Sequence, residues 1–186
     1  SIGEIRIDGN EFFSDGHIRK HLCSRTRNVW LAIKGDRRSR VQQEPLQRDT
    51  LEIKYPYLTS GFLDVRVAHT YEPRVADSSA VVQINIVEGQ EYVVGSSSLS
   101  GDYDREYHRR LNEMVTRLEP GKPVNLFQLK DTEAAMKAYL ANRGYPYARI
   151  SYAIDTIRGA AQSLISYSVT ADSLVHFGNV FVEVAN

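Results

Sequence analysis

The sequence predicts an α+β protein made of two tandem β-α-α-β-β domains. Each is a three-stranded mixed sheet (order 1-3-2) covered by two antiparallel helices. Three observations predict this class. The chain of 186 residues repeats itself, short segments alternate apolar and polar residues as strands do, and longer segments carry apolar residues at helical spacing.

The repeat is clearest in two similar segments, YLTSGFLDVRV at residues 57–67 and YLANRGYPYARI at residues 139–150. Aligning Gly61 with Gly144 defines a constant offset between the two copies, and at this offset apolar positions coincide over a long stretch without a gap. The repeat predicts domains at residues 1–89 and 90–172. Residues 173–186 are expected to be the first strand of a further unit or a C-terminal extension.

The first strand and the start of the first helix are predicted near the N-terminus. Ile5 and Ile7 alternate with charged residues, which indicates a half-buried strand. Gly9 lies in an Asp-Gly-Asn turn that ends this strand. Ser14 or Asp15 is then expected to cap a short helix.

Two amphipathic helices follow in each unit. Pro45 lies where a first-turn proline is tolerated, whereas Pro56 is expected to kink the second helix or to end it early. The apolar stripes are Ile18 and Leu22 (helix one) and Leu46, Thr50, Ile53 and Tyr57 (helix two) in the first unit. In the second unit they are Tyr107, Leu111, Met114, Val115 and Leu118 (helix one) and Leu129, Met136 and Leu140 (helix two).

Gly61 and Gly144 each stand between a helix and a strand, at the C′ position where a left-handed backbone favours glycine. The next residue, Phe62 or Tyr145, is expected to close the helix end against the sheet. Strand two is predicted at residues 62–71 and 145–154. Strand three is predicted around inward-facing residues, which are Val82, Ile84 and Ile86 in one unit and Ile165, Tyr167 and Val169 in the other.

The order of strands within each sheet follows from the connections. A right-handed crossover between strands one and two leaves a central slot, and strand three fills it because it forms a hairpin with strand two. Strands one and two are therefore expected to be the sheet edges. Pro146, at the expected start of a second strand, fits an edge because prolines in sheets are confined to edges and strand starts.

These features resemble the polypeptide-transport-associated (POTRA) domain. The resemblance is carried by the β-α-α-β-β order, by the helix-Gly-aromatic step, by the opening pattern at residues 3–10 and by the Val-x-Ile-x-Ile-x-Glu-Gly pattern at residues 82–89. Tandem copies resemble the periplasmic arm of BamA-type outer-membrane protein assembly factors. The resemblance implies a periplasmic scaffold at the outer membrane, continuous with a C-terminal membrane barrel. It also implies unfolded outer-membrane proteins as clients and accessory lipoproteins as further partners.

An exposed edge strand suggests how such a scaffold binds. Its unpaired backbone groups can accept an extended client as an additional strand, whatever the client's sequence. We expect the second strand of each unit to be this edge, although many edge strands are simply inert. The expected client-binding residues are Leu63, Asp64, Val65, Arg66 and Val67 in the first unit and Tyr147, Ala148, Arg149 and Ile150 in the second.

Other functions are less well supported by the residues. The same architecture suits a two-partner-secretion transporter or a related translocation arm that binds one client, and it also suits a structural spacer that docks a partner. The loop residues Arg37, Arg38 and Arg40 are a second candidate docking site, for an acidic partner or lipid head groups.

Composition and motifs disfavour catalytic, metal and nucleic-acid roles. The chain has 23 basic and 23 acidic residues, a balance that argues against a general nucleic-acid binder. No nucleophile-base pair or phosphate loop is evident, so neither an enzyme nor a cofactor is expected. His17 and His21 have a spacing compatible with a metal but lack a third ligand nearby, so both are expected to face solvent.

Overall fold

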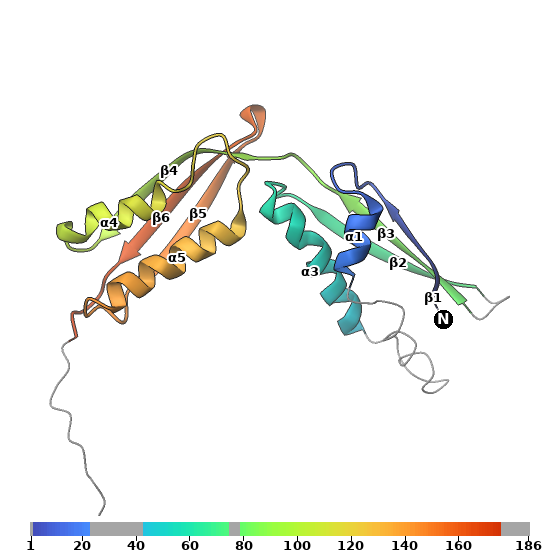
Figure 1. Ribbon diagram of the computed structural model, residues 1–186, viewed down its shortest axis with the longest axis horizontal. Coiled ribbons are helices and arrows are strands. Elements are labelled where there is room, and N and C mark those ends of the chain that lie inside the picture. The colour runs from blue at the N-terminus through green and yellow to red at the C-terminus, as the bar shows by residue number, and fades with distance from the viewer. Residues whose placement is uncertain (1, 23–42, 75–78, 176–186) are drawn as a thin grey trace, which may run out of the picture. The chain divides into compact units, whose positions relative to one another are not determined.

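The computed structural model describes residues 2–22, 43–74 and 79–175. The chain divides into two compact units. The first comprises Ser1–Tyr92 and Pro123–Asn125, and the second comprises Val93–Lys122 and Leu126–Asn186. The structure confirms the predicted fold class in both units (Figure 1).

The first unit contains β1 (Ile2–Asp8), α1 (Asp15–His21), α3 (Gln43–Thr59), β2 (Arg66–Arg74) and β3 (Ser79–Val87). Its sheet has the order β1-β3-β2, in which β1 is parallel and β2 antiparallel to β3. Figure 1 shows α1 and α3 on one face of this sheet. Strands one and two are the sheet edges, as the crossover argument predicts.

Local signals account for the helix ends in this unit. Ser14 is the N-cap of α1, and its side chain accepts a hydrogen bond from the backbone N–H of His17. The expectation that Pro56 ends α3 early is wrong, because the helix continues to Thr59. Pro56 lies in the last turn, so its missing N–H removes only one helical hydrogen bond. Its carbonyl also accepts a hydrogen bond from the Thr59 hydroxyl at 2.8 Å.

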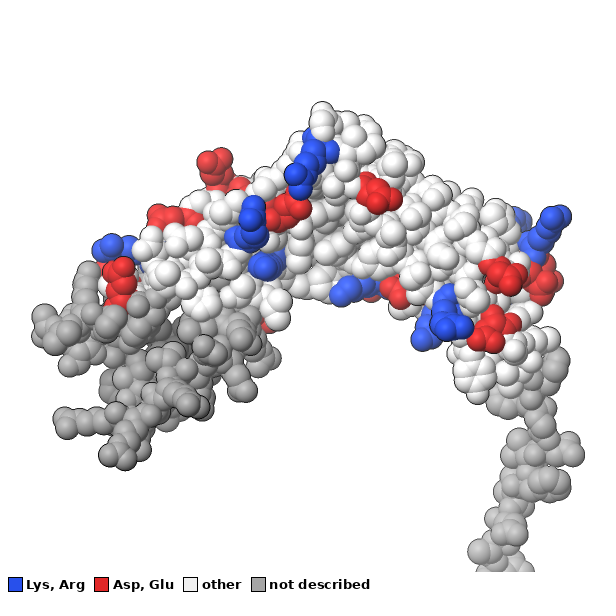
Figure 2. Space-filling view, turned by 180° about the vertical axis from the view of Figure 1, so that it is seen from behind, with Lys and Arg blue, Asp and Glu red and all other residues white. Residues whose placement is uncertain are grey.

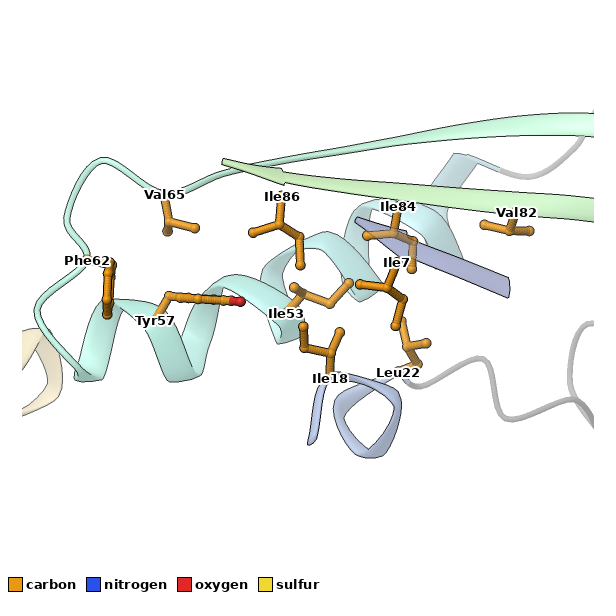
Figure 3. Packing of buried hydrophobic residues seen from close by; sticks show 10 residues of the cluster. All are labelled: Ile7, Ile18, Leu22, Ile53, Tyr57, Phe62, Val65, Val82, Ile84 and Ile86. Atoms are coloured by element: carbon orange, nitrogen blue, oxygen red, sulfur yellow. The ribbon is translucent and has the colours of Figure 1, made fainter. Parts of the chain in front are cut away.

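The core of the first unit lies between the two helices and the sheet (Figure 3). Phe62 and Val65 close one end, where Phe62 packs edge-on against Tyr57. Burial of these apolar side chains is the main force that holds the layers together. The remaining buried members are Ile18 from α1, Leu22 directly after α1, Ile53 and Tyr57 from α3, Ile7 from β1, and Val82, Ile84 and Ile86 from β3.

The second unit contains β4 (Val93–Asp102), α4 (Arg105–Val115), α5 (Leu126–Ala141), β5 (Arg149–Ile157), a 3₁₀ turn η1 (Arg158–Ala160) and β6 (Gln162–Thr170). Its sheet has the order β4-β6-β5, with the same parallel and antiparallel pairings as the first. The predicted helix stripe is buried at Leu111, Met114, Val115 and Leu118, and at Leu129, Met136 and Leu140.

Tyr167 of β6 is fully buried in this second core. Its hydroxyl donates to the Leu129 carbonyl at 2.9 Å, and so ties the central strand to the first turn of α5. Burial raises the pKa of this phenol well above its ordinary value.

Replacing Tyr167 with phenylalanine should lower the free energy of unfolding at pH 7 by about 1 kcal/mol, because one buried hydrogen bond is lost. The folded state favours the neutral phenol. The contribution of Tyr167 to the free energy of unfolding is therefore fully present below the ordinary tyrosine pKa of about 10 and is lost as pH rises through the raised pKa. Phenylalanine cannot ionise, so the difference between the two proteins should shrink above about pH 10. Urea unfolding at neutral and alkaline pH measures both effects. A difference that grows with pH would contradict this assignment.

No helix within the described ranges combines the length and the apolar character that crossing a membrane requires.

Candidate binding edges of the two sheets

The strand that leaves the helix-Gly-aromatic step is one of the two edge strands of each sheet. Within the described ranges, β2 pairs only with β3, and β5 pairs only with β6. One side of each strand therefore carries backbone groups without a partner strand among the described residues. Such an edge can pair with an added strand.

Both edge strands begin later than the sequence predicts. β2 starts at Arg66 and β5 at Arg149, so the predicted starts at residues 62 and 145 are wrong. The physical reason is a turn between helix and strand. The Val65 N–H donates to the Phe62 carbonyl, and the Ala148 N–H donates to the Tyr145 carbonyl. The expected binding residues that lie in or beside this turn, outside the strands, are Leu63, Asp64, Val65, Tyr147 and Ala148; those inside the strands are Arg66, Val67, Arg149 and Ile150.

The glycine before each turn adopts the left-handed conformation that the C′ position needs. Gly61 has φ 93° and Gly144 has φ 92°. The aromatic N–H then caps the helix, with Phe62 N donating to the Tyr57 carbonyl and Tyr145 N donating to the Leu140 carbonyl. Both glycine carbonyls accept a backbone N–H from the segment that follows the third strand, from Tyr92 or from Val175. The two donors are separated along the chain by the same offset as the two glycines.

Tyr92 and Asp64 form a contact that the sequence analysis missed. Tyr92 is fully buried, and its hydroxyl donates to the Asp64 carboxylate at 3.1 Å. Asp64 therefore positions the end of the first unit rather than lining the open edge. The signal in the sequence was an acidic residue in the short segment between helix and strand, a residue type that is typical of turns. Tyr147 occupies the equivalent position in the second unit and is 66% exposed.

Tyr145 anchors the same step in the second unit. Its hydroxyl donates to the Asp104 carboxylate at 2.9 Å, and this hydrogen bond, together with burial, raises its pKa. Asp104 is the N-cap residue of α4, but its side chain makes no capping hydrogen bond. The helix-Gly-aromatic step and the start of α4 are thereby connected through one carboxylate.

Two glycines define which backbone groups face each open edge. The Val169 N and O atoms lie against Gly101, and the Ile86 N and O atoms lie against Gly9. The backbone N–H and C=O groups of successive residues point to alternate sides of a strand. In β6 those of the odd-numbered residues therefore point toward β4, and in β3 those of the even-numbered residues point toward β1.

The register transfers this alternation to the edge strands. Ser168 pairs with Ser151 in the second sheet, and Asn85 pairs with Ala68 in the first. The backbone groups of the intervening residues point to the open side. They are Ile150, Tyr152, Ile154 and Thr156 in β5, and Val67, His69, Tyr71 and Pro73 in β2.

Each edge runs beside a helix. In the first unit the Thr50 hydroxyl lies 3.4 Å from Nδ1 of His69. In the second unit burial and the nearby Glu133 carboxylate raise the pKa of Tyr152. Glu133 is the repeat equivalent of Thr50, and Tyr152 is that of His69, so the repeat extends to the helix-strand contacts.

The outer faces of the two sheets differ in charge. In the second sheet one row across the strands is Ser100, Ser168 and Ser151, and Figure 2 shows uncharged surface over the middle of this unit. The first sheet carries Glu4, Arg6 and Asp8 along β1, where Arg6 and Glu4 form an ion pair at 2.8 Å. The face opposite the helices is therefore not a common feature of the two units, whereas the open edge is.

Several sequence expectations concern other residues. Arg37, Arg38 and Arg40 lie outside the described residues, as does most of the 173–186 segment. The expectation that His17 faces solvent is wrong, because its ring is half-buried and stacks on Phe13 with centroids 4.4 Å apart. Within the described ranges no group of three His, Cys, Asp or Glu side chains is placed to hold a metal ion.

The fold and its open edges define the class of protein, a tandem of POTRA-like α+β domains. Residues 92–172 match the POTRA family, described as a surface antigen variable number repeat. The match covers the second unit, and the first unit repeats its fold. The resemblance that the sequence motifs predict is confirmed.

Known proteins resemble the chain over nearly its full length. A putative outer membrane protein assembly factor of Treponema pallidum (strain Nichols) is 23% identical over 98% of this chain and 21% of its own length. The chain thus spans about a fifth of that relative.

Two solved structures show the same fold. POTRA domains 3–5 of Haemophilus influenzae BamA align with 93% of this chain and 66% of that one, at 18% identity and a TM-score of 0.71. BamA of Haemophilus ducreyi lacking POTRA domains 1–3 aligns with 90% of this chain and 29% of that one, at 15% identity and a TM-score of 0.65.

Proposed function

We propose that this chain is part of the periplasmic scaffold of an outer-membrane protein assembly factor and holds unfolded client polypeptides at its sheet edges. The single observation that carries the proposal is the unpaired side of β2 and of β5 in two equivalent units. The POTRA family match and the name of the Treponema pallidum relative support the same role.

The chemistry of an edge suits a client that must be held and then released. Each backbone hydrogen bond contributes about 0.5–1.5 kcal/mol net, so a handful supplies a few kcal/mol before the entropic cost of association. Binding through backbone groups is weak and tolerates many client sequences. The role is one of binding, with unfolded outer-membrane proteins as clients and accessory lipoproteins as further partners.

Chemical-shift mapping tests this proposal. An unfolded segment of an outer-membrane barrel protein, added to isotope-labelled chain, should perturb amide signals along residues 66–74 or 149–157. Perturbations scattered over the helices, with none on either strand, would overturn the edge mechanism.

Pull-down with several purified, denatured outer-membrane proteins tests the breadth of binding. Capture of several clients supports an assembly factor. Capture of one points instead to a secretion transporter with a dedicated client, and capture of none points to a structural spacer. A charge-matched soluble protein, also denatured, serves as the control for non-specific binding.

A further inference from the structure

The two open edges are equivalent by the repeat but not in their hydrogen-bonding capacity. Pro73 lies in β2 at a position whose backbone faces the open side, and its repeat equivalent in β5 is Thr156. A proline nitrogen carries a ring carbon in place of the hydrogen. β2 therefore presents one backbone donor fewer on its open side. Proline at an edge is one means by which proteins protect a sheet from added strands.

The helix beside each edge differs in the same direction. Thr50, which contacts β2, is followed by Leu51, a bulky residue with 68% of its surface exposed. Glu133, which lies near β5, is followed by Ala134. One helical turn further along, Tyr55 on α3 is 44% exposed, and its equivalent on α5 is Ala138. α5 thus carries smaller side chains than α3 at these two positions.

The β5 edge is uninterrupted in its backbone groups. Ile150, Tyr152, Ile154 and Thr156 each carry both an N–H and a C=O on the open side, and none of them is proline. Two charges are shared by the edge strands, since Arg66 and Glu72 in β2 correspond to Arg149 and Asp155 in β5, whereas Arg74 corresponds to Ile157. The preference proposed below rests on the proline, which removes a backbone donor from β2 alone.

We propose that the second unit, through the open edge of β5, is where an extended client polypeptide adds as a strand, and that β2 is the protected edge. This inference rests on the proposed function and assigns it to one of the two units. The occupant is a proline-free extended segment of an unfolded polypeptide, bound through the backbone of Ile150, Tyr152, Ile154 and Thr156.

Amide hydrogen exchange provides the direct test. The probe is a proline-free peptide of about ten residues, the length of a membrane barrel strand, with alternating apolar and polar side chains. At roughly nine-tenths saturation, exchange at Ile150, Tyr152 and Ile154 should slow by about tenfold. Ser151 and Ala153, which already face β6, are the internal control and should change little.

A pair of swapped variants tests the role of the proline. Thr156→Pro gives β5 the residue that β2 carries at the equivalent position, and it removes no hydrogen bond to β6. It should weaken peptide binding roughly 2- to 13-fold, the equivalent of one backbone hydrogen bond. The matched variant Pro73→Thr should leave the affinity of the β5 edge unchanged. Far-ultraviolet circular dichroism checks that both variants are folded.

The outcomes separate this inference from the proposed function. Protection confined to β5 supports both. Protection at Val67, His69 and Tyr71, with none on β5, overturns the assignment to the second unit and leaves edge binding intact. Protection on neither strand overturns both. Two further peptides are N-methylated at alternate backbone positions, one at the odd and one at the even positions. Only one of the two should bind, because only one set of alternate N–H groups of an added strand faces β5.

Discussion

Replacing Gly101 with alanine should lower the free energy of unfolding of the second unit by more than about 3 kcal/mol. Gly101 has φ 133° and lies in β4 directly against β6. A Cβ at this position would overlap the Val169 carbonyl oxygen, which is backbone of the central strand. Relief requires β4 to move away from β6, and the parallel pairing would be lost around it.

Two matched variants separate the clash from the backbone strain. Gly121 also has a positive φ, 81°, but a Cβ there meets nothing within 4 Å, so Gly121→Ala should show only the strain of about 1–2 kcal/mol. Gly159 has open space and no positive φ, and Gly159→Ala should change stability by less than about 0.5 kcal/mol.

Urea unfolding followed by two-dimensional NMR gives the stability of each unit separately. Equal losses for Gly101→Ala and Gly121→Ala would show that the β4–β6 pairing tolerates a methyl group at Gly101. The same reasoning applies to Gly9, whose Cβ would overlap the Ile86 carbonyl oxygen in the first unit. In both units a glycine is therefore needed where strand one comes close to the backbone of strand three.

The sheet topology was predictable from the sequence because it follows from few constraints. Alternating residues such as Ile84 and Ile86 identify strands, the internal repeat doubles the evidence for each element, and crossover handedness leaves one slot for strand three. Errors in individual residues do not alter an argument of this kind.

The strand starts were not predictable in the same way. Val65 and Ala148 are both buried, and each lies three residues after the aromatic residue of the helix-Gly-aromatic step. A buried residue at this position fits a turn as well as it fits a strand. What separates the two is a hydrogen bond across the turn, from Val65 to Phe62 or from Ala148 to Tyr145, which a sequence pattern does not specify. Thr156 consequently lay beyond the predicted strand, and Tyr152 and Ile154, although inside it, were not among the expected binding residues.

Two other errors arise at helix ends. His17 is half-buried because Phe13, just before the helix, offers an aromatic face that a helical pattern of aliphatic residues does not reveal. Pro56 is tolerated because it falls in the last turn of α3, and helix ends are the least certain features of a sequence-based assignment.

Alanine at Gly61 should destabilise its unit more than alanine at Gly144 destabilises the other, although the two glycines share one role and nearly one φ. At Gly61 a Cβ would lie 2.6 Å from the Tyr92 carbonyl oxygen, which is a backbone atom. The backbone of Tyr92 is held in place because its N–H donates a hydrogen bond to the Gly61 carbonyl. At Gly144 the nearest atom is Cδ1 of Leu174, at 2.8 Å, and that side chain is 48% exposed. An exposed leucine can change rotamer, whereas the Tyr92 carbonyl cannot move without breaking a hydrogen bond.

We therefore expect Gly144→Ala to lower the free energy of unfolding by about 1–2 kcal/mol, the strain of a left-handed alanine, and Gly61→Ala to lower it by about 3 kcal/mol. A double-mutant cycle checks the reason. If Leu174 yields freely, Gly144→Ala and Leu174→Ala should be additive within about 0.5 kcal/mol. Equal losses of unfolding free energy for Gly61→Ala and Gly144→Ala would mean that the segment around Tyr92 shifts as readily as an exposed side chain. The complete burial of Tyr92 argues against such a shift.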